Sequence, residues 1–82
     1  MKDKYFIYFV YEYQGDSDAG IPQYRDCEII SATKKDVKKG MISRDMFNHM
    51  HQLALKAVEF NANVEVSPLD ITILTWNIVR NG

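Results

Sequence analysis

Residues 5–13 read Tyr-Phe-Ile-Tyr-Phe-Val-Tyr-Glu-Tyr, a run in which eight of nine side chains are aromatic or β-branched. This composition and length are typical of a β-strand. Because side chains alternate across a strand, the run has one face of Tyr5, Ile7, Phe9, Tyr11 and Tyr13 and another of Phe6, Tyr8, Val10 and Glu12. Both faces are apolar, whereas a half-exposed strand alternates in polarity. The pattern predicts a strand in the middle of its sheet.

Two further strands are predicted to flank this one. Residues 14–22 are dense in turn formers, and residues 23–31 mix apolar side chains with Arg25, Asp26 and Glu28. Charged side chains discourage further strands from pairing at a sheet edge. Residues 23–31 are therefore expected to form the outer strand of a hairpin. Residues 71–79 read Ile-Thr-Ile-Leu-Thr-Trp-Asn-Ile-Val and predict the last strand.

A long amphipathic helix is predicted over residues 44–60. Ser43 is a favourable N-cap, and Asn61 or Asn63 can supply the left-handed residue that ends the helix. At 100° per residue one face is apolar and Leu55 falls on the polar side. The expected apolar face consists of Met46, Phe47, Met50, Leu53, Ala54, Ala57, Val58 and Phe60. A short helix over residues 34–39, capped by Thr33, is also predicted.

The order strand, strand, helix, strand predicts an α+β fold of β-β-α-β type. A right-handed crossover through the helix returns the chain to the same sheet beyond the first strand. The expected sheet therefore has three antiparallel strands in the order 2-1-3, with one long helix packed on one face. A length of 82 residues fits a single domain, residues 1–82.

Composition limits the classes of function that remain. Ten basic and eleven acidic residues give a net charge of −1, which disfavours a general polyanion binder. Cys27 is the only cysteine, so a disulfide scaffold is excluded, and a reducing, cytoplasmic location is expected. No apolar run reaches the length of a signal peptide core or of a membrane span, so no membrane association is expected.

Catalysis, cofactors and metals are not expected from the motifs. No glycine-rich phosphate loop, serine-centred elbow or nucleophile–base pair can be assembled from the sequence. His49 and His51 lie two residues apart on the predicted helix, so their side chains point in nearly opposite directions and cannot share a metal ion. We therefore expect a protein that is not an enzyme and that carries no cofactor.

A binding role is expected because the predicted sheet has two apolar faces and only one helix to cover them. One helix covers one face of a three-stranded sheet, so the opposite face must leave large side chains in water or meet another surface. The uncovered face is either the tyrosine-rich set or the set of Phe6, Tyr8 and Val10. Because tyrosine tolerates a wet interface, the tyrosine-rich set is expected to contact a host protein or a second copy of the chain. The alternative is that the protein's own loops, or Trp76 and Ile78 of the last strand, cover this face. The expected protein-binding residues are Tyr5, Ile7, Phe9, Tyr11, Tyr13, Asp16, Asp18 and Leu55.

Nucleic-acid binding is the alternative. Half of all basic residues fall in one window of eleven residues, which contains Lys34, Lys35, Lys38, Lys39 and Arg44. A cluster of this density can contact phosphates, although most such clusters are simply solvated.

The whole chain resembles small accessory proteins encoded by tailed phages and prophages. The resemblance rests on an opening aromatic strand, Lys4-Tyr5-Phe6-Ile7-Tyr8-Phe9-Val10-Tyr11, one amphipathic crossover helix and a closing strand, Ile71-Thr72-Ile73-Leu74-Thr75-Trp76-Asn77. It implies a non-enzymatic inhibitor of host machinery, as in anti-CRISPR and other anti-defence proteins. No site residue transfers from that resemblance.

Overall fold

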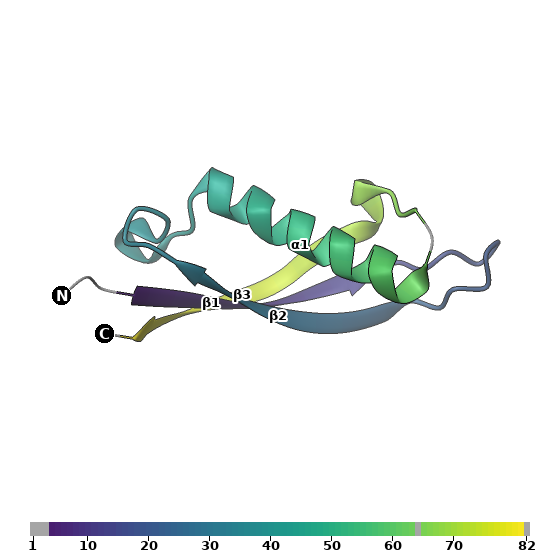
Figure 1. Ribbon diagram of the computed structural model, residues 1–82, viewed down its shortest axis with the longest axis horizontal. Coiled ribbons are helices and arrows are strands. Elements are labelled where there is room, and N and C mark those ends of the chain that lie inside the picture. Colours follow the sequence, from purple (N-terminus) through teal and green to yellow (C-terminus); the bar gives the residue numbers. More distant parts are fainter. Residues whose placement is uncertain (1–3, 64, 82) are drawn as a thin grey trace.

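The computed structural model describes residues 4–63 and 65–81, and the side chains of Lys39 and Asn81 lie outside this description. Three strands, β1 (Lys4–Tyr13), β2 (Tyr24–Ala32) and β3 (Ile71–Asn81), form one sheet in the order β2-β1-β3. Both pairings with β1 are antiparallel. The predicted α+β class, the β-β-α-β order and the central position of the first strand are confirmed (Figure 1).

The single long helix, α1 (Arg44–Ala62), begins and ends at the residues that local chemistry favours. The Ser43 hydroxyl oxygen accepts a hydrogen bond from the Met46 backbone N–H, 3.1 Å away, which satisfies one of the free donors of the first turn. Asn63 follows the helix in the left-handed conformation, with φ of 58°. The predicted N-cap is confirmed, and Asn63 rather than Asn61 ends the helix.

The predicted short helix over residues 34–39 is wrong. Residues 34–36 form a turn, and the 3₁₀-helix η1 (Lys38–Gly40) follows after Val37. An Asp36 carboxylate oxygen accepts from both the backbone N–H and the hydroxyl of Thr33, each at 3.0 Å. These two hydrogen bonds between Thr33 and Asp36 close one turn but do not start a regular helix. A second 3₁₀-helix, η2 (Pro68–Asp70), precedes β3.

The helix lies lengthwise over one face of the sheet (Figure 1). Met50, Ala54 and Val58, spaced by four residues, form its fully buried stripe. Two expectations about its faces are wrong. Phe60, expected in the core, is 87% exposed, and Leu55, expected on the polar side, is partly buried against the core. The helix is thus rotated from the orientation that its sequence predicts.

A β-bulge sets which side chains of β3 face the helix. Thr75 pairs with Val10 and Ile73 pairs with Tyr11, so Leu74 has no partner residue on β1. The extra residue shifts the alternation of side chains by one. As a result Ile71, Ile73, Trp76 and Ile78 are aligned with the buried positions of β1 and contribute to one apolar layer.

Candidate functional site

The face of β1 that was expected to bind a partner is the face that α1 covers. Ile7, Phe9 and Tyr11 are completely buried, and Tyr13 is almost so. Tyr5 is partly buried and packs against the same core. The expectation that this tyrosine-rich face is uncovered is therefore wrong. Side chains without exposed surface cannot contact a partner, so Ile7, Phe9 and Tyr11 are core residues of this fold.

The opposite side of the sheet, which we call the open face, is the one that no other element of the described chain covers. Its members follow from the ladder register, because residues directly opposite each other on neighbouring strands share a face. They are Phe6, Tyr8, Val10 and Glu12 of β1, Arg25, Cys27, Ile29 and Ser31 of β2, and Thr72, Thr75, Asn77 and Val79 of β3.

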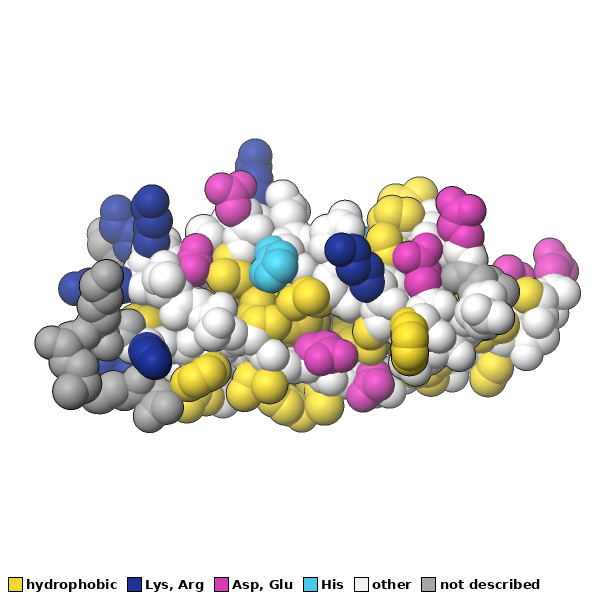
Figure 2. Space-filling model, viewed as in Figure 1, with side chains coloured by type: hydrophobic (Ala, Val, Ile, Leu, Met, Phe, Trp, Pro, Cys, Tyr) yellow, Lys and Arg dark blue, Asp and Glu magenta, His cyan; other side chains and the backbone are white. Residues whose placement is uncertain are grey.

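Large apolar side chains are exposed on this open face. Ile29 is 61% exposed, Val79 45% and Tyr8 43%, while Phe6 and Val10 between them are partly exposed. Tyr8 pairs with Ile29 on one side, and Phe6 pairs with Val79 on the other, so the apolar groups are contiguous across the three strands. In Figure 2 hydrophobic side chains line the lower margin of the molecule, on the side of the sheet away from α1.

Polar groups surround this apolar centre. Thr72, Thr75 and Asn77 lie along the β3 side. At one end Glu12 and Arg25 are directly opposite each other and form an ion pair with an N–O distance of 3.5 Å, and Gln23 donates to the same carboxylate oxygen. An apolar centre with a polar rim is the usual anatomy of a protein–protein contact surface.

Tyr8 and Cys27 interact within the open face. A hydrogen bond with the Cys27 thiol raises the pKa of the Tyr8 hydroxyl, and burial and the charge of Asp26 act in the same direction. Cys27 is a free, exposed thiol. As the only cysteine of the chain, it is a site-specific chemical probe of this face.

The loop between β1 and β2, expected to be an acidic contact region, is held together by one of its own acidic residues. The Asp16 carboxylate accepts from the N–H groups of Asp18 and Ala19, at 3.1 and 3.2 Å. Asp16 also exchanges two backbone hydrogen bonds with Ile21. The carboxylate of Asp16 is thus engaged in the turn, whereas Asp18 is exposed.

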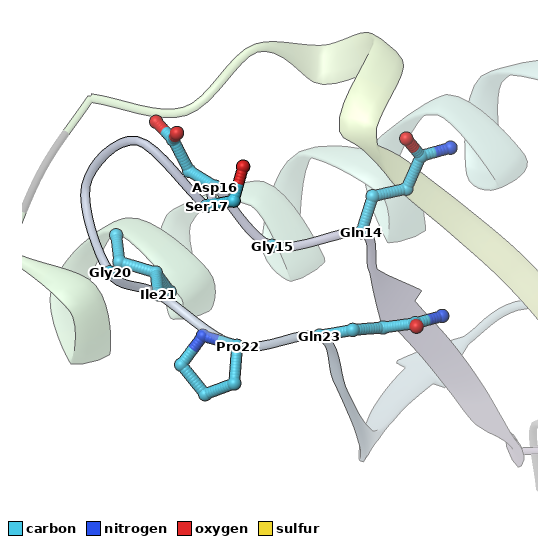
Figure 3. A pocket seen from close by; sticks show the side chains of 8 residues that line it. All are labelled: Gln14, Gly15, Asp16, Ser17, Gly20, Ile21, Pro22 and Gln23. Atoms are coloured by element: carbon cyan, nitrogen blue, oxygen red, sulfur yellow. The ribbon is translucent and has the colours of Figure 1, made fainter.

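This loop lines an open surface pocket of about 600 Å³ (Figure 3). The Gln14 and Gln23 side chains point to one side of it, and the Asp16 and Ser17 side chains lie at the other. Eight loop residues line it: Gln14, Gly15, Asp16, Ser17, Gly20, Ile21, Pro22 and Gln23. Within the described part of the chain no three His, Cys, Asp or Glu side chains gather closely enough to hold a metal ion.

The predicted basic residues lie at the opposite end of the molecule from this loop, which gives the chain two oppositely charged ends (Figure 2). Lys34, Lys35, Lys38 and Arg44 are exposed, and the start of β1 places Lys4 beside them. The side chain of Lys39, also predicted here, lies outside the described residues. Asp36 and Asp45 sit among these cations and reduce the net positive charge.

Sequence reasoning named Phe6, Tyr8 and Val10 as the other possible uncovered set, but missed Cys27, Ile29 and Val79. These three belong to the open face through their pairing with β1. The register of the hairpin would have identified Cys27 and Ile29, because Val10 and Tyr8 lie directly opposite them. The position of Val79 depends on the bulge at Leu74.

Comparison of the chain with protein-family models, with curated proteins and with solved structures gives no match. Within the described residues no helix is long and apolar enough to cross a membrane. The open face, with its apolar centre, polar rim and accessible thiol, is the feature from which a function can be argued.

Proposed function

We propose that this protein is a non-catalytic protein-binding module that contacts its partner through the open face. The observation that carries the proposal is the contiguous exposure of Tyr8, Ile29 and Val79 on the face of the sheet opposite α1. The largest contiguous apolar patch on a monomeric protein is often a contact site.

The chemistry of the open face favours a protein partner. Burying apolar surface stabilises a contact by about 25 cal/mol per Å², and tyrosine adds a hydroxyl that remains useful at a wet rim. Arg25 and Glu12 at one end add charge that can select the partner's orientation. We infer that the partner presents an apolar patch edged by hydrogen-bonding groups.

The resemblance to small phage-encoded accessory proteins extends this proposal. The proteins of that kind whose action is understood tend to be non-enzymatic inhibitors of host machinery. We accordingly propose that the partner is a host protein in the cytoplasm and that binding inhibits it. No cofactor is needed for such a role.

Capture from a bacterial lysate tests the proposal when it is combined with a matched pair of variants. Tyr8→Ser/Ile29→Ser removes two exposed apolar groups from the open face, and Phe60→Ser/Leu69→Ser removes two exposed apolar groups elsewhere. We expect the first variant to lose a specifically captured protein and the second to retain it. Circular dichroism checks that both variants are folded.

The Cys27 thiol then reports where the captured protein binds. Once that protein is purified, its addition should slow modification of Cys27 by a maleimide at least tenfold, because the thiol lies within the open face. Unchanged reactivity of Cys27, or equal capture by both variants, would contradict binding through this face.

Nucleic-acid binding remains a second candidate, favoured by the gathering of exposed Lys34, Lys35 and Lys38 beside Lys4 at one end of the molecule. Contacts between lysines and phosphates release counterions, so binding should weaken steeply with salt. Replacement of Lys34, Lys35, Lys38 and Lys39 by glutamine should abolish a mobility shift of RNA or DNA. The absence of any shift by wild type at low salt would exclude this candidate.

A further inference from the structure

The two outer strands of the sheet differ in how their free edges are protected. On β2, Arg25, Asp26 and Glu28 place charge along the edge. The Asp26 carboxylate also accepts from the Cys27 backbone N–H at 2.8 Å. Charged side chains of this kind, and a backbone donor that is already occupied, discourage another strand from adding to β2.

The outer edge of β3 is less protected within the described residues. His51 Nε2 lies 3.0 Å from the backbone carbonyl oxygen of Ile71, and the bulge at Leu74 interrupts the ladder, but both features precede Thr75. This strand has eleven residues, and from Ile71 to Val79 none is charged or proline. The sheet order shows that β3 is hydrogen-bonded to β1 on one side only. Beyond the bulge at Leu74, the ladder with β1 is regular from Thr75 to the end of the strand. A long, uncharged edge rich in Thr, Ile, Trp and Val is a template for a further strand.

The charge distribution indicates which strand would pair there. The molecule is elongated, about 50 Å by 18 Å by 17 Å. β3 starts next to Asp70, at the end that holds Asp16 and Asp18, and it finishes opposite Lys4, at the end that holds the basic cluster. A second copy running antiparallel would place the acidic end of one molecule beside the basic end of the other, whereas a parallel copy would bring like charges together.

We propose that this protein pairs with a second copy of itself through the outer edges of β3, antiparallel and about a two-fold axis, to form a continuous six-stranded sheet. The contact is self-complementary, as a two-fold interface requires. The uncharged, regular segment Thr75–Val79 has Asn77 at its middle, and we place the axis near that residue.

Such a dimer would also enlarge the open face. At about 4.8 Å between strands and about 3.4 Å per residue, one three-stranded face covers roughly 430 Å² in projection. Specific interfaces usually bury about 800 Å² on each partner, so a single open face is small for a stable contact. Two open faces joined side by side reach that size. The proposed dimer is inferred from the exposed outer edge of β3 and from the opposite charges at the two ends of the molecule. It does not depend on the proposed function.

The oligomeric state provides the first test. Sedimentation equilibrium of the wild-type chain should show a monomer–dimer equilibrium. Thr75→Lys/Asn77→Lys adds exposed charge along the β3 edge and should raise the dimer dissociation constant at least tenfold. Ile29→Lys/Ser31→Lys adds the same charge to exposed positions of β2 on the same face and should leave the dimer intact. A monomeric wild type, or equal loss of the dimer in both variants, would overturn the proposal.

A spin label on Cys27 provides the second test and separates edge pairing from packing of two open faces. In the six-stranded sheet, five strand spacings separate the two copies of β2, so the labelled backbones lie at least about 24 Å apart. Two sheets packed face to face would be about 10 Å apart. A label-to-label distance well above 20 Å supports edge pairing. A distance near 10 Å would refute it, and so would an association that strengthens with added salt.

Discussion

Phe47 of α1 and Trp76 of β3 pack edge to face, with their ring centroids 5.9 Å apart and their planes at 80°. Trp76 lies opposite the buried Phe9 on the sheet, so this pair ties the helix to the outer strand β3. Aromatic pairs in this geometry contribute about 0.5–1.5 kcal/mol beyond their buried area. The pair therefore fixes the position of the helix across the sheet.

Substitution of Phe47 tests its contact with Trp76. Phe47→Leu keeps an apolar side chain but removes the ring, and we expect it to lower the free energy of unfolding by about 1 kcal/mol. Urea titration followed by circular dichroism measures the loss. The control is Phe60→Leu on the exposed side of the same helix, which should change stability by less than about 0.5 kcal/mol. Equal effects of the two substitutions would contradict the packing.

Two methionines distinguish the buried stripe of α1 from the surface. Met50 is completely buried, whereas Met41 is 69% exposed. Met50→Ala leaves a cavity under the helix and should cost about 2–5 kcal/mol of stability, which is a large part of the total for a small domain. Met41→Ala should be nearly neutral. Thermal unfolding of both variants checks this, and a neutral Met50→Ala would show that the helix does not pack as described.

Tyr11 carries a buried hydroxyl that has no hydrogen-bond partner among the described residues. Burial, with the charge of Asp26 as a smaller cause, raises the pKa of this hydroxyl well above its usual value. The folded protein thus holds the proton more tightly than the unfolded chain, so ionisation of this group does not affect stability below about pH 9 and lowers stability as the pH rises through about 10.

We expect Tyr11→Phe to raise stability at neutral pH by about 1 kcal/mol, since it removes an unsatisfied polar group while keeping the ring. The variant should also lose less stability than wild type between about pH 9 and pH 11. Urea titrations at several pH values measure both effects. A variant less stable than wild type at neutral pH would indicate that the hydroxyl has a partner.

The loop between β1 and β2 offers a matched pair of glycines, both with positive φ. A Cβ on Gly15, with φ of 84°, would lie 2.7 Å from the backbone nitrogen of Gln23 and from the backbone oxygen of Ile21. A Cβ on Gly20, with φ of 73°, would meet open space. Gly20→Ala should cost about 1 kcal/mol of backbone strain. Gly15→Ala should cost more, because backbone atoms must also move. Denaturant unfolding ranks the two, and equal losses would exclude the close approach at Gly15.

Much of the fold was predictable because its signals are local. The aromatic run of residues 5–13 is apolar on both faces, and that is sufficient to place it in the middle of the sheet. Ser43 begins the helix and Asn63 ends it through hydrogen bonds and backbone conformations that involve near neighbours only. Strand order followed from chain connectivity, because a helix that crosses over the sheet returns the chain to its far edge.

The face that remains open was decided only by the tertiary structure. Because both faces of β1 are apolar, its own pattern does not say which one the helix covers. The neighbouring strand β3 decides which face the helix covers. The bulge at Leu74 brings Ile73 and Trp76 onto the same face, although their spacing of three residues would separate them in a regular strand. The sheet thereby presents its more apolar side to α1 and leaves the threonines and Asn77 of β3 in water. Local sequence patterns specify the strands, the helix and their order. The bulge in β3 depends on the pairing of two backbones, and it decides which face of the sheet stays exposed.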